Sequence, residues 1–193
     1  MQRNPSNHLT ASGTLIYKYE TWSEPKILLV CHKKLNVWLC PGGHLESNEL
    51  PHQAAEREFL EETGIAVRAI APSKLLAPKK ADSQFLPLPF ATNLHWVSRE
   101  NFDRREVGKS PLPQWPKGCE QHYNQSYLVA FAKQPQADPS LDQTGFDPAE
   151  TTDMRWVTFA EAQEVSVWPG IRWEIEQAFR VYNTGELAHI KMH

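Results

Sequence analysis

The chain has 193 residues and a formal net charge of −3, with 40% hydrophobic and 22% charged residues. These values are ordinary for one globular domain with a normal core. They exclude the strongly basic character typical of nucleic-acid binding, so a phosphate-bearing ligand would need a local cation, from a metal or from a few Arg and Lys side chains.

The cysteines and the hydrophobic stretches indicate in which cellular compartment the protein is expected. Cys31, Cys40 and Cys119 lack metal-ligand spacing and are expected to be reduced, partly buried thiols. The polar N-terminus shows no apolar segment of a signal peptide, and no apolar stretch approaches the roughly 18 residues that span a membrane. We therefore expect a soluble cytoplasmic protein that binds neither a membrane nor nucleic acid.

The N-terminal part is predicted to consist of short strands after a flexible tail over residues 1–10. Runs rich in β-forming residues cover 14–19, 26–31 and 38–40. A polar turn containing proline separates the first two, which suits a hairpin. Pro41-Gly42-Gly43 then indicates a tight turn, at which the third strand is expected to stop.

The clearest helix pattern covers residues 51–63. Pro51 suits the first helical position, where its missing N–H has no cost. Gly64 suits the position after the helix, because glycine adopts positive φ readily. Residues 65–70 are then expected to form a strand.

Residues 71–120 are predicted to be a long irregular insert, rich in proline and interrupted by a β-like piece at 90–97. Connections of this length in a compact domain are often lids or binding loops. After the insert, strands are predicted at 127–132 and 154–158, and helices at 159–165 and 168–182. The element order favours an α+β fold with a mixed sheet over a doubly wound fold. We expect one domain over 11–185 and a C-terminal tail over 186–193.

The helix at 51–63 carries three glutamates whose spacing suggests chemistry. Glu58, Glu61 and Glu62 stand at i, i+3 and i+4, so they project from one face of a helix. Like charges at this spacing repel each other, and a hard divalent cation such as Mg²⁺ would neutralise them. Arg57 beside this face is expected to form an ion pair with Glu49, which would hold the preceding loop against the helix.

The segment from residue 43 to residue 65 fits the pattern G-x5-E-x7-R-E-U-x-E-E-x-G-U, where U is a bulky apolar residue. The seven fixed positions are Gly43, Glu49, Arg57, Glu58, Glu61, Glu62 and Gly64. At roughly one in fifteen per position, a chance match has a probability on the order of 10⁻⁸ per window. The segment therefore resembles the Nudix box, and looser similarity to that family extends from about residue 12 to residue 165.

The resemblance implies a fold and a reaction. The Nudix fold is a mixed β-sheet sandwiched between helices, an α/β/α arrangement. Nudix enzymes hydrolyse a nucleoside diphosphate linked to another group, using box glutamates to hold Mg²⁺ or Mn²⁺. Carried onto this chain, Glu58 and Glu62 are the expected metal ligands, and Glu61 is a ligand or orients the water. Glu58 is the first choice for the general base, and Arg57 belongs with Glu58 and Glu61 in the expected catalytic group.

Residues around the box complete the site that the resemblance implies. Glu150 lies six residues before Trp156 and is expected to add a carboxylate to the metal site. Glu120 is the rival for that role, ahead of Glu100 and Glu106. Substrate contacts are expected from Gly42, Gly43 and His122, while Glu49 and Gly64 are expected to be structural.

The expected partner is a small nucleotide or diphosphate substrate, and a homodimer is left open. The candidates include NTPs, dinucleoside polyphosphates, nucleotide sugars and diphosphate cofactors, and the sequence does not choose among them. Two alternatives on the same fold are a non-catalytic ligand sensor and an enzyme similar to isopentenyl diphosphate isomerase. The intact set of box glutamates favours the hydrolase over the sensor.

Overall fold

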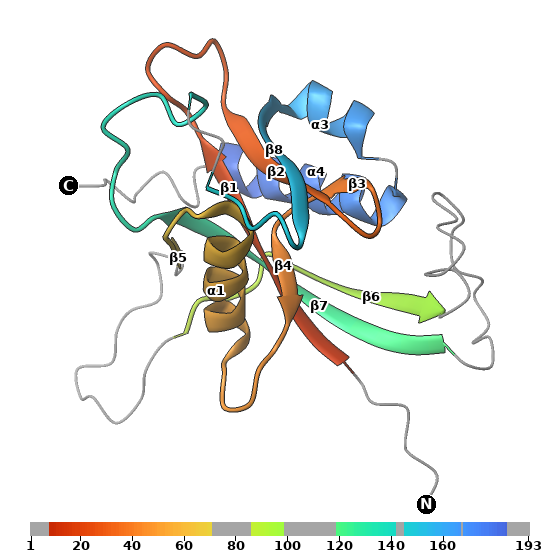
Figure 1. Cartoon of the computed structure of the whole chain (residues 1–193). Coiled ribbons are helices and arrows are strands. Elements are labelled where there is room, and N and C mark those ends of the chain that lie inside the picture. The colour runs from red at the N-terminus through yellow and green to blue at the C-terminus, as the bar shows by residue number, and fades with distance from the viewer. Residues whose placement is uncertain (1–7, 71–85, 99–118, 142–144, 167, 185–193) are drawn as a thin grey trace, which may run out of the picture.

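The computed structural model describes residues 8–70, 86–98, 119–141, 145–166 and 168–184, and within them eight strands form one mixed sheet (Figure 1). The strands are β1 (His8–Tyr17), β2 (Lys26–His32), β3 (Val37–Leu39), β4 (Gly42–His44), β5 (Val67–Ala69), β6 (Ala91–Ser98), β7 (Cys119–Phe131) and β8 (Thr151–Thr158). The described helices are α1 (Pro51–Thr63), α3 (Phe159–Val165) and α4 (Pro169–Asn183). None of the described helices is long and apolar enough to cross a membrane.

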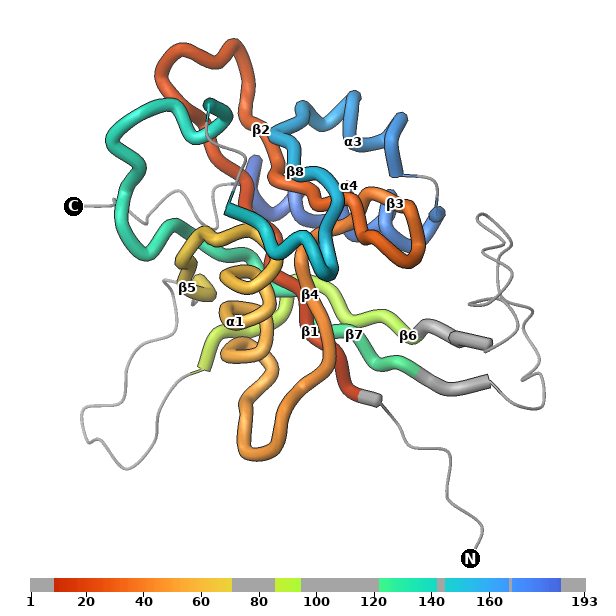
Figure 2. The backbone as a smooth tube through the Cα atoms, viewed as in Figure 1, coloured from red at the N-terminus to blue at the C-terminus, as the bar shows by residue number. Residues whose placement is uncertain are grey.

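Strand β1 joins the two halves of the sheet. Its last residues, Ile16 and Tyr17, pair with β2, which also pairs with β3 and β8. Its first part pairs on one side with β4 and on the other, in parallel, with β7. Strand β7 in turn pairs with β5 and β6. Figure 2 shows β1 passing through the centre of the molecule between these groups of strands.

Helices cover both faces of this sheet. On one face, Phe59 of α1 packs against β1 where Gly13 leaves room for its ring. On the other face, the hydroxyl of Ser12 reaches α4. Because neighbouring residues of a strand point to opposite faces, the two contacts place α1 and α4 on opposite sides of β1. The expected α+β architecture, a mixed sheet between helices, is confirmed.

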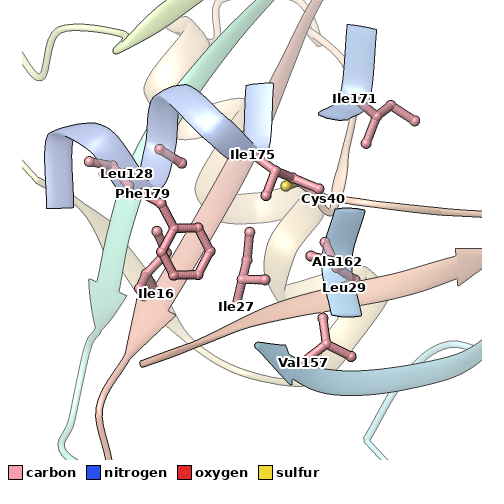
Figure 3. Close-up of a cluster of buried hydrophobic side chains, with 11 residues drawn as sticks. Ile16, Ile27, Leu29, Cys40, Leu128, Val157, Ala162, Ile171, Ile175 and Phe179 are labelled. Atoms are coloured by element: carbon pink, nitrogen blue, oxygen red, sulfur yellow. The ribbon is translucent and has the colours of Figure 1, made fainter. Parts of the chain in front are cut away.

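Each face has its own hydrophobic core. Figure 3 shows the core on the α4 side, where Phe179 and Ile175 of α4 lie over Ile16 and Ile27. On the α1 side, Phe59 is fully buried and packs with Leu15 of β1 and other apolar side chains. The packing of Phe59 on the α1 side holds α1 at a fixed position against the sheet.

Most predicted elements are confirmed with small shifts, but two strands are longer than expected. The strand predicted to begin at Thr14 begins at His8, so residues 8–10 of the expected N-terminal tail belong to β1. The strand predicted from Tyr127 begins at Cys119. Both extensions are polar and gain their partners from each other, since β1 and β7 pair in parallel from His8 to Leu15.

The third strand stops at Leu39, before Pro41, as predicted, but the tight turn predicted over Pro41-Gly42-Gly43 is wrong. Gly42 and Gly43 belong to β4, which pairs with β1 through Gly42 opposite Ser12. A Cβ at Gly42 would overlap the main chain of Ala11 and Ser12, so glycine lets these strands approach closely. Parts of the predicted insert (71–85 and 99–118) and of the tails (1–7 and 185–193) lie outside the described residues.

Candidate active site

The ends of α1 place its side chains relative to the sheet. The N–H of Leu50 donates to the side chain of Gln53 over 3.0 Å, and Pro51 occupies the first turn. At the other end, Gly64 has φ 71° and its N–H donates to the carbonyl of Leu60 over 2.8 Å. The predicted helix bounds and the role of Gly64 at the end of the helix are confirmed.

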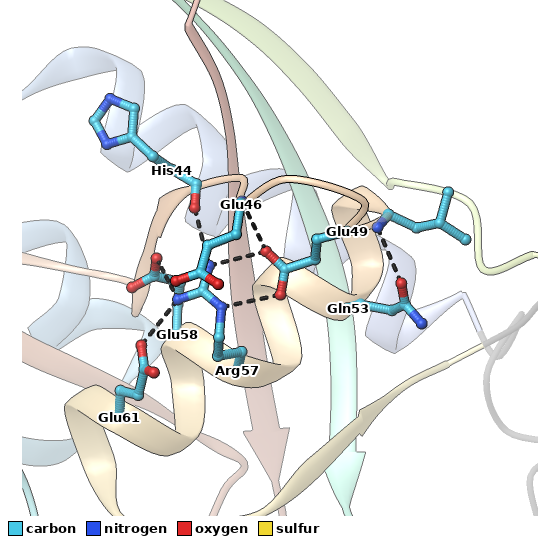
Figure 4. Close-up of polar contacts among 8 residues, drawn as sticks. His44, Glu46, Glu49, Gln53, Arg57, Glu58 and Glu61 are labelled. Carbon is cyan, nitrogen blue, oxygen red and sulfur yellow. Dashed lines mark hydrogen bonds and ion pairs between the residues drawn. The ribbon is translucent and has the colours of Figure 1, made fainter.

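Arg57 is the centre of the polar contacts beside α1 (Figure 4). Its Nε and Nη2 each donate to one carboxylate oxygen of Glu49 over 2.9 Å, so the predicted ion pair is confirmed. Nη1 donates to Glu58 and to Glu61, each over 2.9 Å. Nη2 also donates to the main-chain carbonyl of His44 over 2.9 Å. One guanidinium thus joins α1, the loop before it and the end of β4.

Arg57 and the groups that it binds are called the Arg57 contact set, and its opposite charges stabilise each other. The Arg57 guanidinium holds the pKa of Glu49 below its ordinary value. Its carboxylate partners raise the pKa of Arg57 further, so it stays protonated at all relevant pH values. Glu49 also accepts from the N–H of Glu46 over 3.1 Å, so the loop before α1 is held at both its ends.

Three carboxylates converge next to Arg57. Glu58 and Glu62, one helical turn apart, and Glu150 each offer an oxygen within 4.8 Å of the others. Glu58 is 9% exposed and Glu62 is 3% exposed, whereas Glu150 is exposed. Glu150 immediately precedes β8, and its carbonyl accepts from the N–H of Lys33 over 2.8 Å. Chain segments far apart in the sequence therefore bring the three groups together.

The electrostatics of these carboxylates are unfavourable without a cation. Burial raises the pKa of Glu62 to about 8, and the charges of Glu58 and Glu150 add to that effect. Burial likewise raises the pKa of Glu58, although Arg57 opposes the shift. A set of hard oxygen donors, two of them buried and repelling each other, is what Mg²⁺ or Mn²⁺ binding requires. The residues present therefore fit a divalent cation.

Gly42 and Gly43 shape this group of carboxylates. The N–H of Gly42 donates to Oε2 of Glu62 over 3.1 Å. A Cβ at Gly43 would overlap the carboxylate of Glu58. The contacts of both glycines are thus with the glutamates, and their expected contact with substrate stays a prediction.

Glu61 does not lie with the other two box glutamates. Its side chain is 54% exposed and bound to Arg57, and it is outside the group formed by Glu58, Glu62 and Glu150. Its role as a metal ligand or in catalysis stays a prediction. Glu120 lies within β7, not before it, and its side chain is outside the described residues, as are Glu100 and Glu106.

His122 contacts a neighbour of Arg57 but is not part of the group formed by the glutamates. It belongs to β7, and its ring packs edge-on against the ring of His44 with 4.9 Å between the centroids. The carbonyl of His44 is bound by Arg57. His122 is therefore one residue removed from the Arg57 contact set, and its contact with substrate stays a prediction.

A buried polar residue on α4, Glu174, is not predicted from the sequence. Glu174 is 6% exposed and accepts a hydrogen bond from Ser12 over 2.9 Å. The sequence does contain a signal for its burial, because the residues of one face recur with the helical period. These residues are Ile171, Glu174, Ile175 and Ala178. A carboxyl on such a face needs a polar partner, and the partner could only be found once β1 was placed.

Comparisons with known proteins agree with this geometry. The model of the NUDIX domain family matches residues 15–178. A probable DHNTP pyrophosphohydrolase of Lactococcus lactis subsp. cremoris (strain MG1363) is 30% identical over 102 residues, which are 53% of this chain and 54% of that protein. The chain thus matches about half the length of this relative.

Two solved structures resemble most of the chain. A NUDIX-family hydrolase from Clostridium perfringens has a TM-score of 0.59 at 22% identity, over 92% of this chain and 97% of that one. An Ap4A hydrolase of C. elegans has a TM-score of 0.57 at 15% identity, over 92% of this chain and 98% of that one. At these identities the similarity concerns the fold.

Proposed function

Because the chain belongs to the NUDIX family, we propose that it is a Mg²⁺- or Mn²⁺-dependent enzyme that directs water into a diphosphate linkage. The substrate is a nucleoside triphosphate or a nucleoside diphosphate linked to another group. The convergence of Glu58, Glu62 and Glu150 within 4.8 Å is the observation that carries this proposal. Three carboxylates in that arrangement offer the oxygen ligands that a divalent cation shares with substrate phosphates.

When bound, the cation would supply charge neutralisation for the diphosphate and a lowered pKa for the attacking water. Glu62 and Glu150 would hold it together with Glu58, and Glu58 would accept the proton of the attacking water. The pKa of Glu58 is raised by burial, which brings the group closer to the neutral range in which a general base works best. Arg57 keeps the Glu58 carboxylate oriented through its bond of 2.9 Å.

The neighbouring residues have supporting roles in this proposal. Glu61, bound to Arg57 at the exposed edge of α1, orients the water. His122 and the main chain at Gly42 and Gly43 contact the phosphates from the side of β4. The ring contact between His122 and His44 supports this role, because it places His122 next to the Arg57 contact set.

Two alternatives on the same fold have less support. A non-catalytic sensor would not need a full set of box glutamates, whereas this chain keeps Glu58 and Glu62 buried and adds Glu150. An enzyme similar to isopentenyl diphosphate isomerase lacks a supporting cysteine motif here. The two described cysteines, Cys31 and Cys40, are buried in the strands and turns of the sheet and lie outside the carboxylate group.

We also propose a cytoplasmic location, since Cys31 and Cys40 are free thiols, as is usual in reducing compartments. The names of two relatives mention DHNTP and Ap4A, and both compounds belong in the first set of substrates to test. Association as a homodimer stays a prediction.

The test is a screen of NTPs, Ap4A, DHNTP and nucleotide sugars, with release of phosphate or pyrophosphate as the readout. We expect hydrolysis of at least one of these compounds with Mg²⁺ or Mn²⁺, loss of hydrolysis with EDTA, and recovery when the metal is restored. Full turnover in metal-free buffer would contradict the proposal, as would complete inactivity of a folded protein towards the whole set.

A further inference from the structure

One row of residues on the sheet is polar across four strands. His44 of β4 pairs with Thr10 of β1, Thr10 with Asn124 of β7, and Asn124 with Asn93 of β6. Residues paired in register point to the same face, so these side chains share one side of the sheet. Ser12 lies two residues along β1 from Thr10, and its contact with α4 shows that this is the α4 side.

Most of the polar groups behind this row satisfy each other. The amide nitrogen of Asn124 donates to the hydroxyls of Ser12 and Ser126, over 3.1 and 3.0 Å. Its amide oxygen accepts from Thr10 over 3.2 Å, and Ser12 donates to Glu174 over 2.9 Å. Asn124, Ser126 and Glu174 are all buried. The orientation of the Asn124 amide is therefore fixed by its neighbours.

Asn93, which pairs with Asn124 in the row, lacks the hydrogen bonds that Asn124 makes. Both polar atoms of its side chain are buried, and neither has a hydrogen-bond partner within the described part of the chain. A buried amide without partners is costly, and native structures contain few such groups. The network beside Asn93 is hydrogen-bonded, whereas the amide donor and the amide acceptor of Asn93 are unpaired within the described part of the chain. This difference indicates a binding position for a ligand.

The row also connects Asn93 with the glutamates. Strand β4, at the other end of the row, contains Gly42, whose N–H binds Glu62. Three strand spacings separate Asn93 from β4, which is about 14 Å. Glu58 lies on the opposite, α1 side of the sheet, against Gly43. A ligand that reaches from Asn93 to the glutamates therefore crosses this face and passes around the edge of the sheet at β4, so it is an extended molecule with phosphates at one end.

We propose that Asn93 is a specificity-determining residue that binds the hydrogen-bonding edge of a nitrogen heterocycle in the substrate. This inference rests on the proposed function and names the other end of the same substrate. A side-chain amide with both atoms open pairs with an edge that carries an acceptor next to a donor, as asparagine does with adenine. Purine, pyrimidine and pterin rings carry such an edge, whereas a phosphate chain does not. The hydrogen bonds of Asn124, Ser126 and Glu174 hold the strands next to the bound substrate ring in one arrangement.

The test compares nucleotides with inorganic tripolyphosphate, which has no ring. Asn93→Leu removes both hydrogen-bonding atoms at similar size. We expect it to raise KM for the nucleotides that the wild type hydrolyses by about 10-fold or more, the scale of losing a paired base contact. The value of kcat and any hydrolysis of tripolyphosphate should stay unchanged. The matched control is Asn183→Leu, at the exposed end of α4, which should change neither parameter.

A second variant keeps the test decisive if Asn93→Leu fails to fold. Asn93→Asp keeps the size and replaces the donor with an acceptor, so it should change the order of preference among bases. Unchanged KM values in both folded variants, or in Asn93→Asp alone if only it folds, would overturn the inference while leaving the proposed function intact. If the wild type hydrolyses nothing, the proposed function fails, and calorimetry with adenosine and guanosine in EDTA then tests Asn93 by itself. Binding of a nucleoside that Asn93→Asp weakens would support the inference, and no binding would overturn it.

Discussion

The main-chain N–H of Gly42 donates to Oε2 of Glu62 across 3.1 Å, and this bond joins an edge strand to the buried side of α1. Glu62 is 3% exposed, so the carboxylate has little contact with water to replace that donor. The strand β4 thereby fixes one of the carboxylates that form the candidate metal site.

Glu58→Gln and Glu62→Gln should each keep the fold and remove most of the activity. Each change removes a buried carboxylate that repels its acidic neighbours. Glutamine at position 62 can still accept the bond from Gly42, and glutamine at position 58 can still accept the bond from Arg57. Unfolding temperatures should therefore be equal to the wild-type value or higher. Turnover should fall by at least about 10²-fold, the scale of losing a general base or a metal ligand. A variant that unfolds, or that works at close to the wild-type rate, would show that the role proposed for that residue is wrong.

Gly43→Ala should weaken metal binding, because a Cβ there would push the carboxylate of Glu58 out of its position. Moving a ligand through a neighbouring residue costs about 10- to 100-fold in metal affinity. We expect the Mg²⁺ concentration for half-maximal rate to rise by that factor. Gly13→Ala is the control: its Cβ would press on the Phe59 ring, lowering stability by about 1–3 kcal/mol without changing the Mg²⁺ requirement.

Glu150→Gln and Glu61→Gln test whether the two exposed carboxylates, Glu150 and Glu61, have different roles. Glu150 lies within 4.8 Å of Glu58 and Glu62, whereas Glu61 is bound to Arg57 away from that group. We expect Glu150→Gln to raise the Mg²⁺ concentration for half-maximal rate. Glu61→Gln should leave that concentration unchanged and lower turnover alone, and Glu120→Gln should change neither. A shift for Glu61→Gln and none for Glu150→Gln would reverse the assignment.

Glu174 predicts a pH dependence of stability. Burial raises its pKa above the ordinary value of 4.5, although Ser126 and Ser12 oppose the shift. The folded state therefore binds more protons than the unfolded state as pH rises above that value, and stability falls, by at most about 1.4 kcal/mol per pH unit. In urea unfolding, the advantage of Glu174→Gln over the wild type should be near zero at pH 4.5 and grow towards pH 8. An advantage that does not change with pH would show that Glu174 is ionised in the folded protein.

Local patterns explain which parts of the site could be predicted. The bounds of α1 follow from Pro51 and Gly64, and the bond between Arg57 and Glu49 follows from spacing along the loop and the helix. Glu150 was expected near the metal site from its position before Trp156, and the structure brings it to Glu58 and Glu62.

The polar row could not be predicted in the same way. Its residues lie far apart in the chain: Thr10 and Asn124 are 114 residues apart. Parallel pairing of β1 with β7 leaves no local signal for its register. For the same reason β4 was interpreted as a turn, since only its pairing with β1 makes the glycines part of a strand.

The central claim is that Glu58, Glu62 and Glu150 together hold one divalent cation. Anomalous X-ray diffraction from crystals grown with Mn²⁺ tests it most directly, because the ion is located without reference to activity. We predict a peak in direct contact with carboxylate oxygens of all three residues, at about 2.1 Å, as in sites for small hard cations. A peak elsewhere, or one more than about 5 Å from the Glu150 carboxylate and so beyond even a water-bridged contact, would contradict the claim.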